Sequence, residues 1–517
     1  MKKNLLLFSP LLLPAVAAAQ GRYNIVYIMT DDHTAQMMSC YDNRFVETPN
    51  LDRIAADGVK FVNSYVANSL SGPSRACMIT GKHSHKNGFT NNEHGIFDGT
   101  QQTMPKLLQQ AGYQTAIVGK WHLVTLPTGF DYWNILPEQG DYYNPDFITM
   151  QNDTVRERGY VTNIVTDKAI DWMEHRRDRS KPFALFIHHK ACHRCWLPEI
   201  KYLREYEDKT FALPETFYDN YEGRRAAAAA QEMEIADNRH MDIVYDTKMY
   251  RPGMTTRLTS NYLRMISRLD SADLQQYNDV YEPLARDFYR QNLSGKALAE
   301  FKYQRYMRDY AKVLKSLDDN IGRTLDYLRE AGLLDSTLVV YTSDQGFYMG
   351  EHGWFDKRFM YEESFATPLV MRLPAGLEAK GDIPELVQNI DYAPTFLELA
   401  GAPVPEDIQG VSLLPLLKGK HPKNWRKSLY YHYYEYPAEH SVKRHYGVRT
   451  ADGWKLIHFY RDIDEWELYD LNTDPQELHN LYGQPGTEKV TQRLMKELVK
   501  LQQQYDDQPA LELNAKP

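Results

Sequence analysis

The chain has 517 residues, which is long enough for one large domain and a smaller one around a sizeable buried core. Its contents of 43% hydrophobic and 25% charged residues are ordinary for a soluble globular protein. The formal net charge of −9 argues against a general nucleic-acid binder, but it does not exclude an anionic substrate, because a local pocket of Lys, Arg and His can oppose the global sign.

Residues 1–19 have the three parts of a secretory signal peptide. Lys2 and Lys3 supply the positive start, an apolar run reaches Leu13, and three alanines at positions 17–19 form a small-residue cleavage site. No Cys follows the apolar run, and no later stretch approaches the ~18 apolar residues that a membrane span needs. We therefore predict an exported protein, periplasmic or secreted, with no stable membrane anchor and no nucleic-acid partner.

Four short apolar runs are predicted to be strands, and polar side chains follow each of them. Helices alternate with these runs, for example over residues 48–58, which have Pro at the start and Gly at the end, and over residues 104–112. This alternation predicts an α/β fold, in which sites lie beyond the carboxyl ends of the strands. The four runs cover residues 22–30, 113–119, 183–187 and 336–342.

The first and last of these runs deliver oxygen ligands. Asp31 and Asp32 follow the first run, and Asp344 and Gln345 follow the last. A set of oxygens without His or Cys favours Ca²⁺ or Mg²⁺ over zinc. The structural alternative is that the first pair caps a helix and the second forms a turn before Gly346. Because two such pairs end two separate runs, we predict one metal site and assign it to Ca²⁺.

The second half of the chain contains a helical region and then a region of short strands. Residues 301–331 have helical periodicity, and residues 224–230 form a shorter helix candidate. A Pro-containing stretch at 402–424 is predicted to be a linker between a catalytic domain, residues 20–425, and an α+β subdomain, residues 426–517. The predicted elements of this subdomain are antiparallel strands at 430–436, 445–449, 454–460 and 467–471, and a helix at 486–505.

The chain has only four cysteines, too few for a disulfide scaffold. Cys192 and Cys195 are close enough in sequence to form a bridge, but Cys40 and Cys77 do not complete a zinc site with them. Free thiols are the favoured prediction, and a bridge between residues 192 and 195 is the alternative.

The most informative segment is residues 71–81, with the sequence Ser-Gly-Pro-Ser-Arg-Ala-Cys-Met-Ile-Thr-Gly. Pro73 fits the first turn of a helix, where its missing N–H costs no hydrogen bond. Ser71 is then expected just before a helix N-terminus, where free N–H groups and the helix dipole favour a developing anion.

This segment resembles the signature of the formylglycine-dependent sulfatases, (Cys/Ser)-x-Pro-Ser-Arg-x-x-x-x-Thr-Gly, at every defined position. The resemblance extends over about residues 22–480. It implies an alkaline-phosphatase-like α/β/α sandwich with a smaller C-terminal antiparallel-sheet subdomain. It also implies that a serine-competent maturing enzyme oxidises Ser71 to formylglycine, whose hydrate attacks the sulfur of a sulfate ester.

The resemblance assigns roles to further residues. Lys120 and Lys357 match two sulfate-binding lysines, and Arg75 matches the arginine that stabilises the formylglycine. His122 matches the histidine that acts on the formylglycine hydroxyl, and His193 matches the acid that protonates the departing sugar oxygen. The family's metal ligands match the four oxygen donors described above, although Asn or His often stands where this chain has Gln345. Another departure is Cys192, which stands where the family has Pro before the catalytic histidine.

Residues 80–93 and the run Tyr-Gln-Thr-Ala-Ile-Val-Gly-Lys look most like the glucosamine-6-sulfatase branch. This likeness implies a sulfated oligosaccharide substrate with 6-O-sulfated N-acetylglucosamine, from mucin O-glycans or glycosaminoglycans. Asp356, Arg358 and His445 are the candidate sugar-binding residues. Two other functions remain possible at this stage: a phosphodiesterase or phosphonate hydrolase of the same superfold, and a non-catalytic sulfated-glycan-binding protein in which Ser71 is never oxidised.

Overall fold

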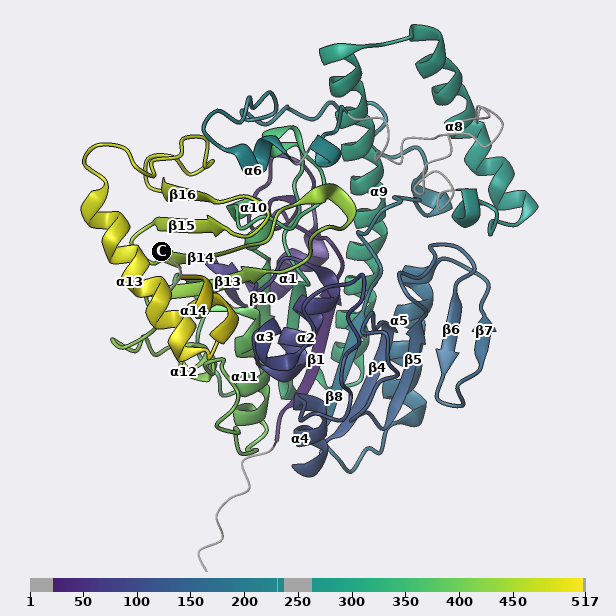
Figure 1. The fold of residues 1–517 in the computed structure, drawn as a ribbon. Helices are drawn as coiled ribbons and strands as arrows, with labels where there is room; N and C mark the ends of the chain where they lie inside the picture. The colour runs from purple at the N-terminus through teal and green to yellow at the C-terminus, as the bar shows by residue number, and fades with distance from the viewer. Residues whose placement is uncertain (1–21, 230, 237–262, 515–517) are drawn as a thin grey trace, which may run out of the picture.

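The structure is a computed structural model that describes residues 22–229, 231–236 and 263–514. The predicted signal peptide, residues 1–19, lies outside the described residues. A ten-stranded sheet with helices on both faces forms the larger part, and a four-stranded sheet lies against it (Figure 1).

Five parallel strands form the centre of the large sheet. Their order is β9 (Thr337–Ser343), β1 (Asn24–Thr30), β8 (Phe183–His188), β4 (Gln114–Lys120) and β5 (Tyr132–Leu136). All residues of β9, β1 and β8 are buried, because helices cover both faces of the sheet. The four predicted strands are therefore confirmed, and they lie next to one another in space.

Short strands that the sequence analysis did not predict extend the sheet at both edges. On one side, β10 (Leu369–Arg372) runs antiparallel to β9 and is followed by β2 (Gly58–Phe61) and β11 (Gly381–Ile383). On the other side, β6 (Asp146–Thr149) and β7 (Thr154–Arg156) form an antiparallel extension of β5. A separate parallel pair joins β3 (Ser64–Tyr65) to β12 (Val387–Gln388).

The helices form two layers because alternate side chains of the strands point to opposite faces. On β1, Val26 and Ile28 belong to one core, and Ile25 and Tyr27 belong to the other. The first core includes α1 (Pro49–Ala56), α5 (Val161–Asp171) and α9 (Gly295–Glu330). The second includes α2 (Ser71–Thr80), α4 (Met104–Gln110), α11 (Tyr392–Leu399) and α12 (Leu414–Leu417).

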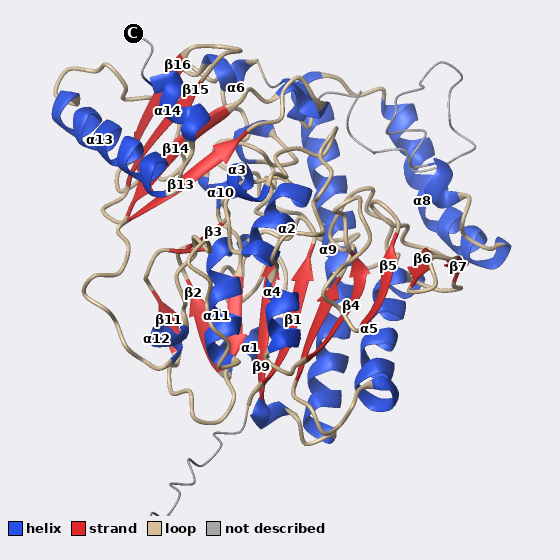
Figure 2. Cartoon of the chain, turned by 60° about the horizontal axis from the view of Figure 1, so that its bottom comes forward, coloured by secondary structure: helices blue, strands red, loops and turns tan. Residues whose placement is uncertain are grey.

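The C-terminal strands form an antiparallel meander, as predicted (Figure 2). One face of this sheet packs against α13 (Glu488–Gln504) and lies near α14 (Gln508–Asn514). The other face packs on rings of the larger part, among them Trp354, Phe359 and Tyr361. The strands are β13 (Ser428–Tyr433), β14 (His445–Thr450), β15 (Trp454–Phe459) and β16 (Glu465–Asp470).

The regions between these elements differ in part from prediction. The stretch 402–424 is not an open linker, since it contains α12, whose Leu414, Leu416 and Leu417 are buried. The helix candidate at 224–230 is shortened to α6 (Arg225–Ala228). Other helices are α3 (Ser84–Asn87), α8 (Ser271–Gln291) and α10 (Glu362–Phe365).

All four cysteines are described residues, and none of them forms a disulfide. No helix in the described part of the chain has the length and apolar character needed to cross a bilayer.

Candidate active site

The polar residues that follow the parallel strands meet at one edge of the large sheet. Asp31 and Asp32 follow β1, Lys120 ends β4, and Asp344 follows β9, all without exposed surface. These residues adjoin in space because β9, β1, β8 and β4 are neighbours and run in the same direction. Four charged groups from distant parts of the chain can therefore interact directly there.

Ser71 is the first residue of α2 and lies over this edge, so the helix begins one residue earlier than expected. Its hydroxyl donates a hydrogen bond to Asp31 Oδ1 at 3.3 Å. Four residues later on the same helix, Arg75 donates to Asp344 Oδ2 from Nε at 3.1 Å and from Nη2 at 2.9 Å. The helix thus directs both residues of the 71–81 segment at the carboxylates, and its N-terminus adds a favourable field for an anion.

Lys120 pairs with Asp31 inside the protein. Its ammonium also donates to Gln139 Oε1 at 2.5 Å. Burial lowers the pKa of Lys120 to about 8, although Asp31 acts in the opposite direction. Burial would raise the pKa of Asp31, but the charges of Lys120, His193, Arg75 and Lys357 together hold this pKa well below its usual range. The two groups therefore form a buried ion pair.

The second carboxylate, Asp32, carries features that fit a cation. Its Oδ1 accepts hydrogen bonds from Gln345 Nε2 and from Lys357 Nζ, each at 2.5 Å. Its Oδ2 and the Oε1 of Gln345 are both buried and have no hydrogen-bond partner. Unsatisfied buried oxygens are costly. A hard divalent ion bound by these oxygens would remove that cost.

The arrangement differs from the predicted ligand set in two ways. Asp31, Asp32 and His193 each bring one ligand atom into a group spanning no more than 4.8 Å, so a histidine joins the carboxylates. Asp344, by contrast, uses Oδ2 for Arg75 and Oδ1 for the backbone N–H of Asp32 at 3.2 Å. The oxygens that have no hydrogen-bond partner are therefore on Asp32 and Gln345, and Asp344 is fully hydrogen-bonded.

Two histidines flank the cluster. His193 donates from Nδ1 to the carbonyl oxygen of Arg194 at 2.6 Å, and its Nε2 lies 3.8 Å from Asp32 Oδ2. His122, which has a φ of 57°, contacts Gln139 Nε2 through its own Nε2 at 2.9 Å. Burial lowers the pKa of both imidazoles well below the usual range, so both are neutral.

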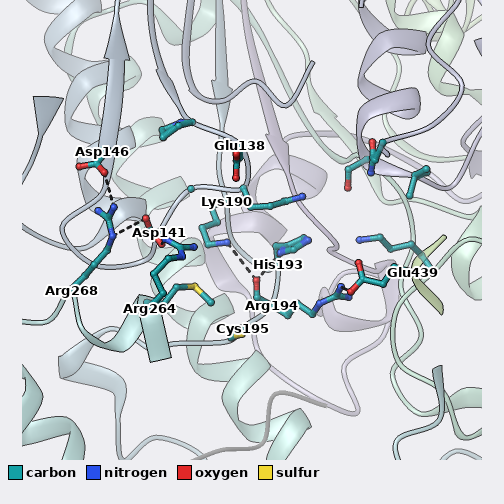
Figure 3. A pocket seen from close by; sticks show the side chains of 18 of the residues that line it. Glu138, Asp141, Asp146, Lys190, His193, Arg194, Cys195, Arg264, Arg268 and Glu439 are labelled. Carbon is teal, nitrogen blue, oxygen red and sulfur yellow. Dashed lines mark hydrogen bonds and ion pairs between the residues drawn. The ribbon is translucent and has the colours of Figure 1, made fainter. Parts of the chain in front are cut away.

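A cavity of about 340 Å³ opens over the cluster (Figure 3). Ser71, Gln139, His193, Lys357 and Arg358 are among its lining residues. The lining also carries many further charges of both signs, as Figure 3 shows. These charged residues are Glu138, Asp141, Asp146, Lys190, Arg194, Arg264, Arg268 and Glu439.

The three predicted sugar-binding residues have different positions. Arg358 lines the cavity and pairs with Glu435 at 3.2 Å. Asp356 is fully buried behind it, where Arg194 Nη1 donates to its Oδ2 at 2.5 Å and His440 lies 3.1 Å away. His440 and Arg358 hold the pKa of Asp356 well below its usual range in spite of burial. Asp356 is therefore placed to orient the residues that face the cavity.

The structure does not bring His445 to the cavity. Its Nδ1 donates to the carbonyl oxygen of Lys443 at 2.8 Å, and its Nε2 accepts from the N–H of Met360 at 3.1 Å. The ring is fully buried among aromatic rings, including Phe359 and Phe459. Both nitrogens are thus used by the backbone, which corrects the expectation that His445 contacts the sugar.

Sequence reasoning also missed residues of the site. Gln139 comes from the loop after β5 and joins Lys120 to His122, but no local pattern marks it. Arg194 stands next to the predicted His193, and its position beside that residue was a usable signal. Glu439 and His440 belong to the C-terminal part and reach the site only through the tertiary fold.

Comparison with known proteins identifies the class. Residues 23–402 match the family model described as sulfatase, and residues 350–504 match the C-terminal model of N-sulphoglucosamine sulphohydrolase. The chain therefore belongs to the sulfatase family, with the alkaline-phosphatase-like fold, and is a sulfuric ester hydrolase. The predicted family and fold are confirmed. Sulfatases generally use a formylglycine and a metal ion.

Among individual proteins, the N-acetylglucosamine-6-O-sulfatase of Bacteroides thetaiotaomicron is 51% identical over 492 residues, covering 94% of this chain and 87% of that protein. An arylsulfatase of Clostridium perfringens is 28% identical, covering 92% of this chain and 94% of that protein. A solved structure in complex with its substrate, D-glucosamine-2-N,6-O-disulfate, aligns with a TM-score of 0.90 and 50% identity, over 96% of this chain and 100% of that chain.

A phosphonate monoester hydrolase from Silicibacter pomeroyi also aligns, with a TM-score of 0.68 and 20% identity over 94% of this chain and 96% of that chain. At this identity the likeness concerns the fold alone. The fold therefore does not distinguish a sulfatase from a phosphonate hydrolase, and only the residues of the site can distinguish them.

Proposed function

We propose that this chain is an exported sulfatase that removes the 6-O-sulfate of N-acetylglucosamine from host glycans. The similarity to an N-acetylglucosamine-6-O-sulfatase supports the sugar and the position, as does the fit to a structure that holds a 6-O-sulfated glucosamine. The signal-like residues 1–19 support export to the periplasm.

The observation that carries the proposal is the position of Ser71. It begins α2, hydrogen-bonds to Asp31 and lines a cavity that is also lined by Lys357 and His193. In this proposal a serine-competent maturing enzyme oxidises Ser71 to formylglycine before the chain folds. Arg75, on the same face of α2, then lies beside the modified residue and restrains the carboxylates around it.

A divalent ion, which we assign to Ca²⁺, fits between the carboxylates and would stabilise negative charge on the sulfate ester. Asp31, Asp32 and Gln345 would hold the ion. Asp344 would either turn from Arg75 to join these ligands or stay bound to Arg75 beside them. The choice of calcium rests on the oxygen donors with no hydrogen-bond partner, although His193 lies near enough to be a neighbour of the ion.

The chain's own residues then bind and orient the substrate. Lys357 lines the cavity, and Lys120 lies beneath it, so their ammonium groups can neutralise charge on the transferring sulfuryl oxygens. His193 lines the same cavity, and its Nδ1–H is held by a backbone carbonyl. Nε2 is therefore the atom that would take up a proton from water when the anionic ester binds, and then deliver that proton to the sugar oxygen. General acid catalysis of this kind contributes about 10²–10⁴-fold.

His122 is the second histidine with a role in this proposal. Because Gln139 donates to its Nε2, the proton of the neutral ring is on Nδ1. To accept a proton from a hydroxyl of the matured residue 71, the neutral imidazole must use Nε2, so the amide of Gln139 has to turn away from that nitrogen first. This would allow the sulfate to be released and the aldehyde to be restored.

A direct test combines mass and activity. Peptide analysis of residues 71–75 from the native host should show the loss of two hydrogens at Ser71. The purified enzyme should release sulfate from 6-sulfated N-acetylglucosamine faster than from the 3-sulfated isomer. An unmodified Ser71 together with glycan binding would favour the non-catalytic alternative, and turnover of phosphodiesters with no sulfate release would favour the phosphodiesterase alternative.

A further inference from the structure

A second cavity, of about 830 Å³, lies on the side of the molecule that carries α12 and α13, away from β6 and β7 (Figure 1). One wall comes from residues 411–428, which follow and include α12, and the other comes from α13 and Tyr505. It shares no lining residue with the catalytic cavity. Its size is that of cavities that hold ligands. We refer to it as the α13 groove.

The segment that forms the first wall is unusually basic. Residues 418–427 read Lys-Gly-Lys-His-Pro-Lys-Asn-Trp-Arg-Lys, with no acidic residue, in a chain with a net charge of −9. Clusters of this kind bind polyanions. Residues 418–424 of this segment lie within the stretch that the sequence analysis had assigned only to a linker.

The charges of this segment are available to a ligand. The lysines at positions 418, 420, 423 and 427 are all exposed, and none forms an ion pair with another described residue. Lys423 and Lys427 line the groove, and Lys500 of α13 faces them from the other wall, where it pairs with Glu497 at 3.1 Å. Glu497 is the acidic residue of the lining, so cations outnumber acids.

Two side chains that are held by hydrogen bonds or ion pairs, those of Trp425 and Arg426, give the groove a fixed shape. Trp425 lines it, and its indole donates from Nε1 to the carbonyl oxygen of Leu386 at 2.9 Å. Arg426 is held by Asp391 at 2.5 Å and is largely buried. The indole is therefore a half-buried flat surface between exposed lysines, an arrangement suited to a sugar ring flanked by anionic groups.

We infer that the α13 groove is an accessory site that binds a sulfated polysaccharide chain. The occupant follows from charge complementarity and from the proposed function, on which this inference rests: the polymer that carries the substrate is itself a polyanion of sugars. Binding at the groove keeps the polymer on the enzyme while its sulfated end enters the catalytic cavity. Substrates too short to reach the groove gain nothing from it.

The test is a double charge reversal, Lys423→Glu with Lys427→Glu, compared with a control that changes net charge equally, Lys181→Glu with Lys296→Glu. Both control lysines are exposed and line neither cavity. Binding to immobilised heparin, measured over a series of salt concentrations, should weaken about tenfold or more in the groove variant, with a salt slope shallower by about two. The control should bind like the wild type.

Turnover separates this inference from the proposed function. In the groove variant, kcat/KM should fall on a polymeric 6-O-sulfated substrate and stay unchanged on 6-sulfated N-acetylglucosamine. Equal losses of heparin affinity in the two double variants would overturn the inference. So would binding of hyaluronan or single-stranded DNA to the groove as tightly as heparin. A wild type that binds heparin through the groove but fails to hydrolyse the monosaccharide would instead overturn the proposed function.

Discussion

Gln139 provides the sharpest test of how the site is assembled, because it touches two groups that the proposed reaction needs. Its Oε1 accepts from Lys120 at 2.5 Å, and its Nε2 contacts His122 Nε2 at 2.9 Å. Gln139→Met keeps a similar volume and removes both contacts. We therefore expect a folded protein with a freer Lys120 and a His122 that is no longer held in one tautomer.

The expected size follows from the charge on Lys120. A hydrogen bond to a charged group contributes about 1.5–3 kcal/mol, which corresponds to about 10–150-fold in rate. We expect kcat for 6-sulfated N-acetylglucosamine to fall within this range and KM to change less, because Gln139 acts as a positioning residue on groups that act in the transition state. Gln151→Ala, on the exposed loop between β6 and β7, is the control and should behave like the wild type.

A second variant tests the tautomer. Gln139→Glu keeps an oxygen for Lys120 but places a carboxylate beside the imidazole, which stabilises the protonated ring and raises the pKa of His122. The limb of the pH–kcat profile that reports this histidine should then move to higher pH. If Gln139→Met retained activity within about twofold, or if the Glu variant left the profile unmoved, the assigned contacts would not matter to catalysis.

Four further outcomes are expected. Ser71→Ala should abolish turnover and leave the melting temperature nearly unchanged, and normal activity would refute the assigned nucleophile. Chelation should remove activity, and Ca²⁺ should restore it better than Zn²⁺; tightly bound zinc in the native protein would contradict this. His445→Ala should lower the unfolding free energy by about 2–3 kcal/mol by leaving buried backbone groups unpaired, with KM unaffected, which thermal denaturation and kinetics can check. Burial would raise the pKa of Glu207, but Arg305 and Lys312 outweigh it and lower the pKa to about 2, so the stability it supplies is complete above its ordinary value of 4.5 and is lost as the pH falls through about 2. The unfolding free energy of Glu207→Gln should therefore approach that of the wild type as the pH falls, and a constant gap would contradict the assignment.

The part of the site that could be predicted is the part set by the parallel sheet. Asp31, Lys120 and Asp344 each stand directly after an apolar run, and parallel neighbours bring such positions together. The same rule does not predict the position of Gln139, because this residue lies three residues beyond β5 in a loop whose course depends on tertiary packing. Short edge strands such as β7 escaped prediction because all their residues are exposed and carry no apolar pattern.

The failure at His445 has a specific physical cause. A strand's side chains alternate between its two faces, so the sequence alone leaves two choices for each residue until the register is known. His445 pairs with Phe459 on β15 and points into the aromatic layer that joins the two sheets. His440, five residues earlier and outside the strand, lies by Asp356 instead.

The charges of the site are compatible with the metal ion that sulfatases generally use. Six buried ionisable groups meet around Asp31 and Asp344, three carboxylates and three cations: Asp31, Asp32, Asp344, Arg75, Lys120 and Lys357. When all six are charged, their charges cancel. Burial, and then the neighbouring charge of Asp31, raise the pKa of Asp344 to about 7, because a further negative charge is unfavourable in this enclosure. A divalent ion would relieve that repulsion and would give the site a net positive charge beside the cavity that Ser71 lines.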